Sequence, residues 1–268
     1  MAIPAPTRST ASRFCKYSSL RPEQLDWLKV IILKHELYFP NLSQLNDPAD
    51  GRPKLAPNTA DQLVSFSYSD LLRRKPGLSR DSQEEEQATI QFSVQRSGKD
   101  LQAWLEKNGT ESIQRMMAQS LYAELDDYRV YSLSKRWDNL GMWAKYAANH
   151  SGYCLEFANE GPFASACDVT YGEYLLDLTD LEQRSNPFLF FCKSKDWSNE
   201  EEARILLLRG SNAVVRIEPR WLTRLILGEN TSDDHRQLIR QWAKLREPEL
   251  AVVSAYYDEL HQVLRLRT

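Results

Sequence analysis

A carboxylate-rich segment near residue 200 has the residue types best suited to chemistry. Glu200, Glu202 and Arg204 alternate along it, and the apolar residues 205–208 follow. Because side chains of a β-strand alternate between two faces, these three groups would share one face at the mouth of a strand. A carboxylate beside an arginine fits a catalytic or ligand-binding site there. It fits equally a salt-bridged strand end that adds little to stability.

An aromatic stripe with one histidine makes up a second candidate segment. Met142, Tyr146 and His150 are spaced by four residues, which places them along one face of a helix, with Trp143 beside them. His150 would end that helix, where the helix dipole and a carboxylate such as Glu156 favour the imidazolium form. Such a stripe is more often part of a core, so His150 is both a candidate catalytic group and a candidate core residue.

Two strand serines and an early tyrosine complete the set of candidates. Ser132 and Ser134 alternate along strand-forming residues just before the aromatic helix, and they are suited to form the floor of a small-molecule site. Tyr17 lies on a short first strand, where a polar side chain between apolar neighbours can point into a cleft. The plainer interpretation is that Tyr17 packs in the core and that Asn46-Asp47-Pro48 is a turn.

The composition excludes several common enzyme classes. Ten glycines form neither a G-x-G-x-x-G nor a G-x-x-x-x-G-K-(S/T) loop, so a Rossmann or phosphate-loop nucleotide site is not expected. The sequence has no H-E-x-x-H and no G-x-S-x-G, and its four histidines are too scattered for a metal cluster. A net charge of −3 argues against a general nucleic-acid binder.

The cysteines and the apolar runs predict a cytoplasmic protein. Cys15, Cys154, Cys167 and Cys192 form no Cys-x-x-Cys pair and lie in apolar stretches typical of reduced, buried thiols. No apolar run approaches the roughly 20 residues needed to span a bilayer, so no membrane partner is expected. Residues 1–12 lack the apolar core of a secretory signal and are expected to form a disordered tail.

One α+β domain over residues 13–268 is predicted to position these groups. Strands gather at the beginning and in the second half, with helices between them, which favours a mostly antiparallel sheet. Expected strands are residues 13–17, 36–39, 128–133, 152–157, 167–171, 203–208, 214–217 and 222–227, with two weak ones before 268. A first helix is expected to begin at Pro22, and most of residues 58–127 are expected to be helical, with breaks at Pro76-Gly77, Gly98 and Gly109. Two further helices are expected over residues 139–149, with Asp138 as the N-cap, and over residues 233–245.

Four motifs of this sequence resemble those of a bacterial family known as a domain of unknown function. The family's marks are an early K-Y-(R/S)-S-L, an N-D-P, an M-W-x-x-Y-x-x-x-H-x-G, and a W-x-x-E-x-E followed by an aromatic residue and Arg. The resemblance covers about residues 13–230. The motifs lie at residues 16–20, 46–48, 142–152 and 197–204, and Ala203 departs from the aromatic residue of the last one.

The opening strand, helix, strand and loop also resemble ADP-ribosyltransferase-type domains, which bind NAD without a glycine-rich loop. The resemblance implies NAD as a substrate and no metal. It places Lys16 or Tyr17 at the first-strand position, Ser132 or Ser134 on a middle strand, and Glu202 on a later strand. Lys16 departs from the family's His or Arg, because a flexible ammonium does not reproduce an imidazole or a guanidinium fork.

The implied chemistry is cleavage of the nicotinamide–ribose bond through an oxocarbenium-like transition state, by a transferase or glycohydrolase serving as a toxin or defence effector. The resemblance gives Glu202 the task of facing the developing positive charge. Stacking on nicotinamide falls to Tyr17, Trp143 or Tyr146. Binding of phosphate or a carboxylate falls to His150 or Arg204. The acceptor, a protein or a nucleic acid, is left open.

A non-catalytic module that binds a nucleotide or a partner is the alternative. The two accounts differ in geometry: an enzyme needs Glu202 unpaired in one cavity with Tyr17 and His150, whereas a Glu202 neutralised by Arg204 favours the binding module. Nucleic-acid processing ranks last, because basic stretches such as residues 73–75 are diluted by acidic residues.

Overall fold

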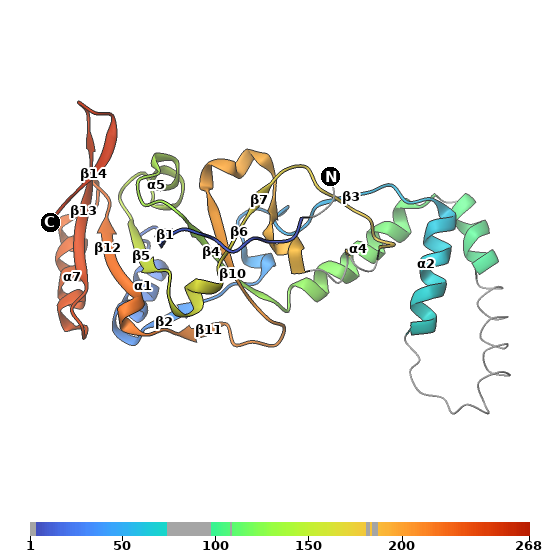
Figure 1. Cartoon of the computed structure of the whole chain (residues 1–268), viewed down its shortest axis with the longest axis horizontal. Helices are drawn as coiled ribbons and strands as arrows, with labels where there is room; N and C mark the ends of the chain where they lie inside the picture. Colours follow the sequence, from blue (N-terminus) through green and yellow to red (C-terminus); the bar gives the residue numbers. More distant parts are fainter. Residues whose placement is uncertain (1–3, 74–97, 108, 181–182, 184–186) are drawn as a thin grey trace.

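The computed structural model describes residues 4–73, 98–107, 109–180, 183 and 187–268 (Figure 1). Its centre is an eight-stranded sheet in the order β14-β13-β12-β5-β1-β4-β10-β6. The pair β12–β13 is parallel and the other pairs in this sheet are antiparallel, so the expected α+β fold with a mostly antiparallel sheet is confirmed. The strands are β1 (Arg13–Ser18), β4 (Arg129–Ser134), β5 (Tyr153–Ala158), β6 (Cys167–Asp168), β10 (Glu202–Leu207), β12 (Leu222–Leu227), β13 (Ala251–Asp258) and β14 (Val263–Arg267).

Helices cover both faces of this sheet. α1 (Pro22–Lys34) and α7 (Asp233–Leu245) pack on one face, and α5 (Leu140–Tyr146) packs on the other. α1 begins at Pro22, whose missing N–H is not needed in a first turn, and ends at His35, whose φ of 60° is left-handed. None of the described helices is long and apolar enough to cross a membrane.

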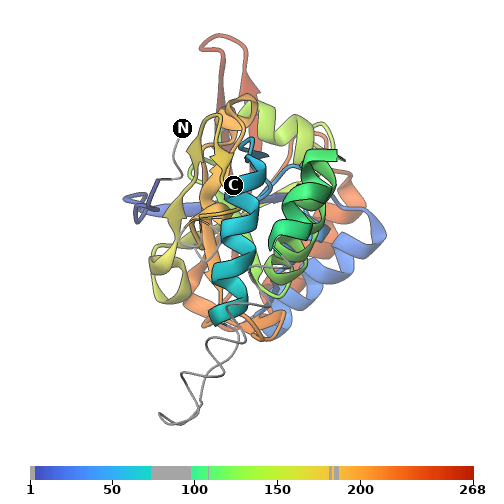
Figure 2. The same ribbon diagram turned by 90° about the vertical axis from the view of Figure 1, so that its right-hand side faces the viewer.

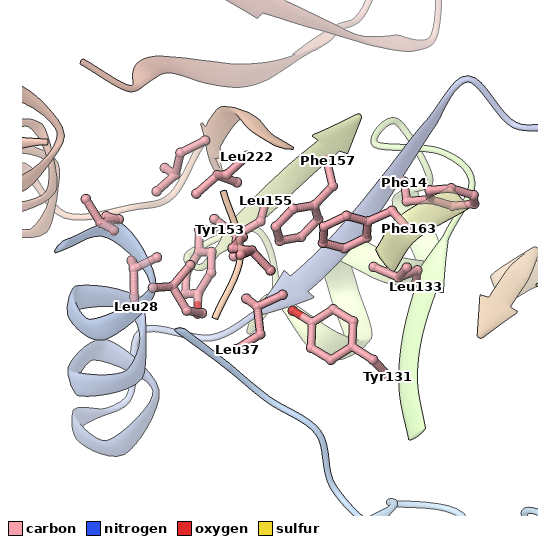
Figure 3. Close-up of a cluster of buried hydrophobic side chains, with 14 of the residues drawn as sticks. Phe14, Leu28, Leu37, Tyr131, Leu133, Tyr153, Leu155, Phe157, Phe163 and Leu222 are labelled. Atoms are coloured by element: carbon pink, nitrogen blue, oxygen red, sulfur yellow. The ribbon is translucent and has the colours of Figure 1, made fainter. Parts of the chain in front are cut away.

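The main core lies between the sheet and α1 with α7. Alternation along β1 sends Phe14 to this side, while Cys15 and Tyr17 face α5. Figure 3 shows the aromatic centre of the core, where the ring centroids of Phe157 and Phe163 are 4.4 Å apart. Burial of these large side chains contributes most of the stability that holds β1, β4 and β5 in place.

A helical extension continues the chain beyond the β10 end of the sheet (Figures 1 and 2). It contains α2 (Ala60–Arg73), the helical residues 98–107 and α4 (Glu111–Leu125). The expected break at Gly109 is confirmed, since its φ is 77°, whereas Gly98 lies in a helical stretch and marks no break within the described residues. The expected break at Pro76-Gly77 lies outside the described residues.

Short strands and 3₁₀ helices connect the larger elements. Three two-stranded pairs are β2 (Glu36–Tyr38) with β11 (Val214–Arg216), β3 (Lys54–Leu55) with β8 (Leu175–Leu176), and β7 (Thr170–Tyr171) with β9 (Cys192–Lys193). The 3₁₀ helices are η1 (Leu42–Gln44), η3 (Gly161–Ser165), η4 (Pro187–Phe191), η5 (Lys195–Glu200) and η6 (Pro219–Trp221).

The helix expected over residues 139–149 is shorter than predicted. α5 ends at Tyr146, and the next turn carries Ala148, Asn149 and His150 in left-handed conformations, with φ values of 47°, 53° and 65°. Gly152 ends this turn, where a Cβ would lie 2.2 Å from the carbonyl oxygen of Ser18. The left-handed turn at residues 148–150 therefore occupies the place of the last expected helical turn.

Three local predictions also need correction. The N-cap of α5 is Asn139, whose side chain accepts a hydrogen bond from the N–H of Met142. The carboxylate of Asp138 instead accepts hydrogen bonds from Arg136. Residues 7–9, expected in a disordered tail, make backbone hydrogen bonds with residues 166–168. The four cysteines are unpaired as expected, but Cys167 is only partly buried.

Candidate functional site

A pocket on the α5 side of the sheet brings the candidate segments together. Its cavity volume is about 90 Å³, and it is partly open to solvent. Four chain segments that are distant in the sequence supply its walls. The candidates that line it are Lys16, Tyr17, Ser132, Ser134, Tyr146, Glu200 and Glu202.

Arg204 is the fully buried centre of the ion network beneath this pocket. Its Nη1 and Nη2 donate to the two carboxylate oxygens of Asp50 at 2.7 and 2.6 Å. Its Nε and Nη2 donate to Glu202 at 2.7 and 3.0 Å, and Nη1 also donates to the carbonyl of Phe190 at 2.7 Å. These five hydrogen bonds use all five N–H donors of the guanidinium, so none remains for a ligand.

Lys193 joins the two glutamates at the pocket wall. Its Nζ donates to Glu200 at 2.8 Å and to Glu202 at 2.9 Å, and it lies 3.6 Å from Asp50. Glu200 also accepts from the hydroxyl of Tyr146 at 2.6 Å and from Lys145 Nζ at 3.2 Å. The side chains of Lys193, Glu200 and Glu202 are at most 5% exposed, so the network is shielded from solvent.

A tight turn presents Asp50 to this network. Asp47 accepts from the N–H groups of Ala49 and Asp50, the first through its side chain and the second through its carbonyl. Gly51 completes the turn at a φ of 66°, where a Cβ would also meet the Leu42 side chain at 2.8 Å. The turn expected at Asn46-Asp47-Pro48 therefore exists, and it has a role in the site.

Glu200 and Glu202 do not lie on one continuous strand. Glu200 ends the 3₁₀ helix η5, Glu201 is left-handed with a φ of 45°, and β10 begins at Glu202. The prediction that Glu202 and Arg204 share a strand face is confirmed by their ion pair. The strand position predicted for Glu200 is wrong, because the turn at Glu201 interrupts the alternation.

The charges of the network shift the ionisation of its members. Burial opposes ionisation of Glu202, but Arg204 and Lys193 outweigh it and lower the pKa of this carboxyl group. Burial likewise disfavours the charged form of Lys193, yet Glu202 and Asp50 raise the pKa of its ammonium. Glu202, Arg204 and Lys193 are therefore all charged at neutral pH.

Lys16 occupies the seam where β1 and β4 separate. These strands pair only at Cys15 and Ser134, whereas β1 pairs with β5 at six positions. The ammonium of Lys16 donates to the carbonyl of Ser132 at 2.9 Å, across the seam. No carboxylate among the described residues lies within ion-pairing distance of it. Burial lowers its pKa to about 8, with Glu202 acting in the opposite direction.

The two glutamates accept the same number of hydrogen bonds but from differently placed partners. A carboxylate offers about four lone-pair sites. Glu202 accepts two bonds from Arg204, which is fully buried, and one from Lys193, which is buried. Glu200 accepts three, one of them from Lys145, whose side chain is 39% exposed. Glu200 therefore lies on the more open side of the network, and Glu202 lies deeper beside Arg204.

The remaining pocket residues are mostly engaged with one another. The Tyr17 hydroxyl donates to the Arg136 carbonyl at 2.7 Å, and burial raises its pKa. Ser134 donates to the Glu200 carbonyl at 3.0 Å. Tyr146 receives a bond from Asn46 at 3.2 Å while it donates to Glu200, so its hydroxyl links two walls of the pocket.

Trp143 and His150 do not reach the pocket. Trp143 is fully buried, its Nε1 donates to the Trp137 carbonyl at 2.7 Å, and its ring meets Tyr17 edge-on. The His150 ring stacks on this indole with ring centroids 5.9 Å apart. Burial lowers the pKa of His150, and the carboxylate that opposes this effect is Glu229.

The structure corrects the expectations for these residues. His150 does not line the pocket that Glu202 lines, which is the geometry that an enzyme was said to need, and its pKa moves away from the imidazolium form. Glu156 is not its partner, because that carboxylate pairs with Arg13 and Arg224. Trp143 and Arg204 are enclosed by protein, so they are unsuited to stacking on nicotinamide or holding phosphate.

Sequence reasoning missed three members of the site. Asp50 follows the N-D-P motif by two residues, Lys193 follows the apolar stretch of η4, and Lys145 lies within the aromatic segment. A charged residue directly after an apolar run was the available signal for Lys193. The described residues contain no group of three side chains suited to holding a metal ion.

Comparisons with protein-family models, curated proteins and solved structures found no match to this chain. The resemblances stated above therefore stay predictions. What the structure adds is that residues of all four motifs lie in or directly beneath one pocket.

Proposed function

We propose that this protein is a small-molecule binding module whose pocket takes the sugar-phosphate part of a nucleotide-class ligand. The observation that carries the proposal is Lys16, a largely enclosed ammonium in the pocket wall without a carboxylate partner among the described residues. Four cations, Lys16, Lys145, Lys193 and Arg204, face three carboxylates, Asp50, Glu200 and Glu202. One anionic group of a ligand would balance this set.

The state of Glu202 favours binding over catalysis. A carboxylate that stabilises an oxocarbenium-like charge must be free to face the reacting carbon. Glu202 is instead paired with Arg204 and Lys193, which occupy three of its roughly four lone-pair sites. This is the arrangement expected of the binding-module alternative.

The polar groups at the pocket suggest how such a ligand would lie. Lys16 would donate to the anionic group, and Glu200 would accept from a sugar hydroxyl through its one remaining site. Leu45 and Met142 supply apolar surface beside them. A phosphorylated sugar combines one strong anion with several hydroxyl donors, so it matches both kinds of contact.

Binding of such a ligand is expected to depend on pH through Lys16. Ribose 5-phosphate keeps its charge above pH 7, because the second pKa of a phosphate monoester is about 6. The free Lys16 ammonium has a pKa of about 8. Its loss as pH rises should weaken binding by up to roughly tenfold per pH unit above that value. Calorimetric titration of ribose 5-phosphate between pH 7 and 9.5 measures this.

The matched control for the pH profile is Lys16→Arg. Its guanidinium keeps its charge throughout that range, so its affinity for ribose 5-phosphate should stay constant from pH 7 to 9.5. A fall in affinity that is equally steep in Lys16→Arg would place the titrating group elsewhere and contradict the role given to Lys16.

A second candidate function is NAD cleavage, as a transferase or glycohydrolase. It is favoured by one observation: Lys16, Ser132 and Glu202, the positions that the transferase resemblance names, line the same pocket. On the binding account we expect no release of nicotinamide from NAD, even when cell extract supplies an acceptor. Nicotinamide release followed over time, with purified wild-type protein, measures this.

If the wild type does release nicotinamide, the variants Glu200→Gln and Glu202→Gln show whether the release depends on these carboxylates. Their folded state must be verified by circular dichroism, because each removes a member of the buried ion network. Release by wild type that folded Glu200→Gln or Glu202→Gln abolishes would replace the binding account with the enzyme account. Equal release by all three proteins would point to a contaminating activity and leave the expectation of no turnover in place.

A further inference from the structure

A cluster of arginines lies where α7 meets the hairpin of β13 and β14, on the face of the sheet opposite the sugar-phosphate pocket (Figure 1). Arg236 and Arg240 are one helical turn apart on α7, so they project from the same side of this helix. Arg267 is the partner of Ser254 in the β13–β14 ladder, so these two side chains share one face of the sheet. A hydrogen bond of 2.7 Å from Arg236 to the Ser254 hydroxyl shows that this is the face that α7 covers.

Arg236 is a half-buried cation whose hydrogen-bond partners are all uncharged. Its guanidinium donates to three backbone carbonyl oxygens at 2.8 or 2.9 Å and to one hydroxyl. Burial lowers the pKa of Arg236, and the charges of Arg267 and Arg240 lower it further, against the opposing effect of Asp233 and Glu229. Like charges near a partly desolvated cation destabilise it unless an anion joins them.

Arg240 and Arg267 are exposed, so a ligand can reach both. Within the part of the chain that the structure describes, no carboxylate lies within ion-pairing distance of either side chain. The carboxylate of Asp258, on the same hairpin, pairs instead with Arg265. The guanidinium carbon of Arg267 lies 5.7 Å from the centre of the Tyr256 ring, which restricts the position of this arginine. The cluster therefore presents positive charge that the described residues do not balance by ion pairs.

A cavity of about 410 Å³ adjoins this cluster, with Arg240 as a shared residue. This volume is within the range of small-molecule sites. Residues 251–253 of β13 pair with β12 but not with β14, and this open corner of the sheet forms part of the cavity wall. Lys244 adds a second cation to the lining and Glu249 adds a carboxylate, and the other lining side chains are apolar.

We propose that the arginine cluster and this cavity bind a free, multivalent phosphate anion of the pyrophosphate class. Arg240 and Arg267 donate to its oxygens, because a planar guanidinium matches phosphate oxygens with two parallel N–H bonds. Arg236 keeps its bonds to the backbone and contributes mainly charge. Three guanidinium groups are balanced only by an anion with several charges. The net charge of −3 favours a compact anion over a nucleic-acid strand. The proposal uses no residue of the sugar-phosphate pocket and stands apart from it.

Calorimetric titration of the full chain with pyrophosphate and with inorganic phosphate, at fixed ionic strength, tests this proposal. We expect pyrophosphate to bind at least about tenfold more tightly than phosphate, because it reaches more of the cations. Arg240→Gln and Arg267→Gln should each weaken pyrophosphate binding by about tenfold or more, the effect of losing one charge-assisted hydrogen bond. Both residues are exposed, so both variants should fold and should bind ribose 5-phosphate like wild type.

Arg115→Gln is the matched control, because Arg115 is an exposed cation on α4, in the helical extension beyond the other end of the sheet. It makes the same change of net charge and should bind pyrophosphate like wild type. Pyrophosphate affinity that Arg240→Gln and Arg267→Gln leave unchanged, an equal loss in Arg115→Gln, or no binding at millimolar concentration would overturn the proposal. Tighter binding of a short oligothymidylate than of pyrophosphate, lost in the same two variants, would overturn the assignment to a free anion in favour of a nucleic-acid backbone.

Discussion

Replacing Arg204 with methionine is expected to lower the free energy of unfolding by about 3–5 kcal/mol. The side chain is fully buried and satisfies both Asp50 and Glu202, which would face each other as uncompensated carboxylates without it. Methionine keeps an unbranched apolar stem like that of arginine but lacks the guanidinium group, so the loss reflects mainly charge and hydrogen bonding. Urea unfolding of the two proteins at pH 7, followed by circular dichroism, measures the difference.

Arg209→Met is the control for this substitution. Arg209 pairs with Asp127 just beyond β10, but both side chains are more than half exposed, so its removal should not change stability measurably. Adding Asp50→Asn to Arg204→Met should recover part of the lost free energy of unfolding, because it removes one of the two buried carboxylates left without a cation. A loss from Arg204→Met no larger than that from Arg209→Met would mean that the network does not hold the site together.

Lys193→Met is expected to produce a loss of similar size, about 3–5 kcal/mol at pH 7, with a characteristic pH dependence. Without this ammonium, Glu200 and Glu202 lose the cation that lies between them. Mutual repulsion then raises a carboxyl pKa above its unfolded value of roughly 4.3. A group with a raised folded-state pKa binds a proton more readily when folded, so the variant recovers stability relative to wild type as pH falls from 7 to 5.

Urea unfolding at pH 7 and pH 5 tests this pH dependence, with Lys195→Met as the control. Lys195 lies two residues further along and is exposed, so its replacement should leave the stability nearly unchanged at both pH values. If Lys193→Met shows the same deficit at pH 7 and pH 5, this lysine does not neutralise the repulsion between the two glutamates.

Much of the fold could be predicted because its signals are local. The helix expected over residues 233–245 has the bounds of α7, and β12 has the bounds expected for 222–227. These segments have clear hydrophobic periodicity and definite start signals, such as the Ser232 cap of α7. The shared face of Glu202 and Arg204 was predictable for the same reason, since two-residue alternation is a local property of a strand.

The site itself could be predicted only in part, because its decisive contacts are long-range. Asp50 and Arg204 are 154 positions apart, and no periodic pattern in either segment indicates that they meet. The alternation of residues 200–204 gave no sign of the left-handed turn at Glu201, so Glu200 was expected on the strand rather than at the end of η5. His150 was misplaced because α5 ends at Tyr146 and His150 lies in the left-handed turn that follows.

Titration of ribose 5-phosphate and of ribose into wild type and Lys16→Met at pH 7 tests the central claim most directly. The wild type should bind ribose 5-phosphate at least about tenfold more tightly than ribose, the size of one charge-assisted hydrogen bond. In Lys16→Met, verified as folded, this preference should disappear. Binding of ribose 5-phosphate that Lys16→Met leaves unchanged, or no binding to the wild type at millimolar concentration, would contradict the assignment of this pocket to a sugar phosphate.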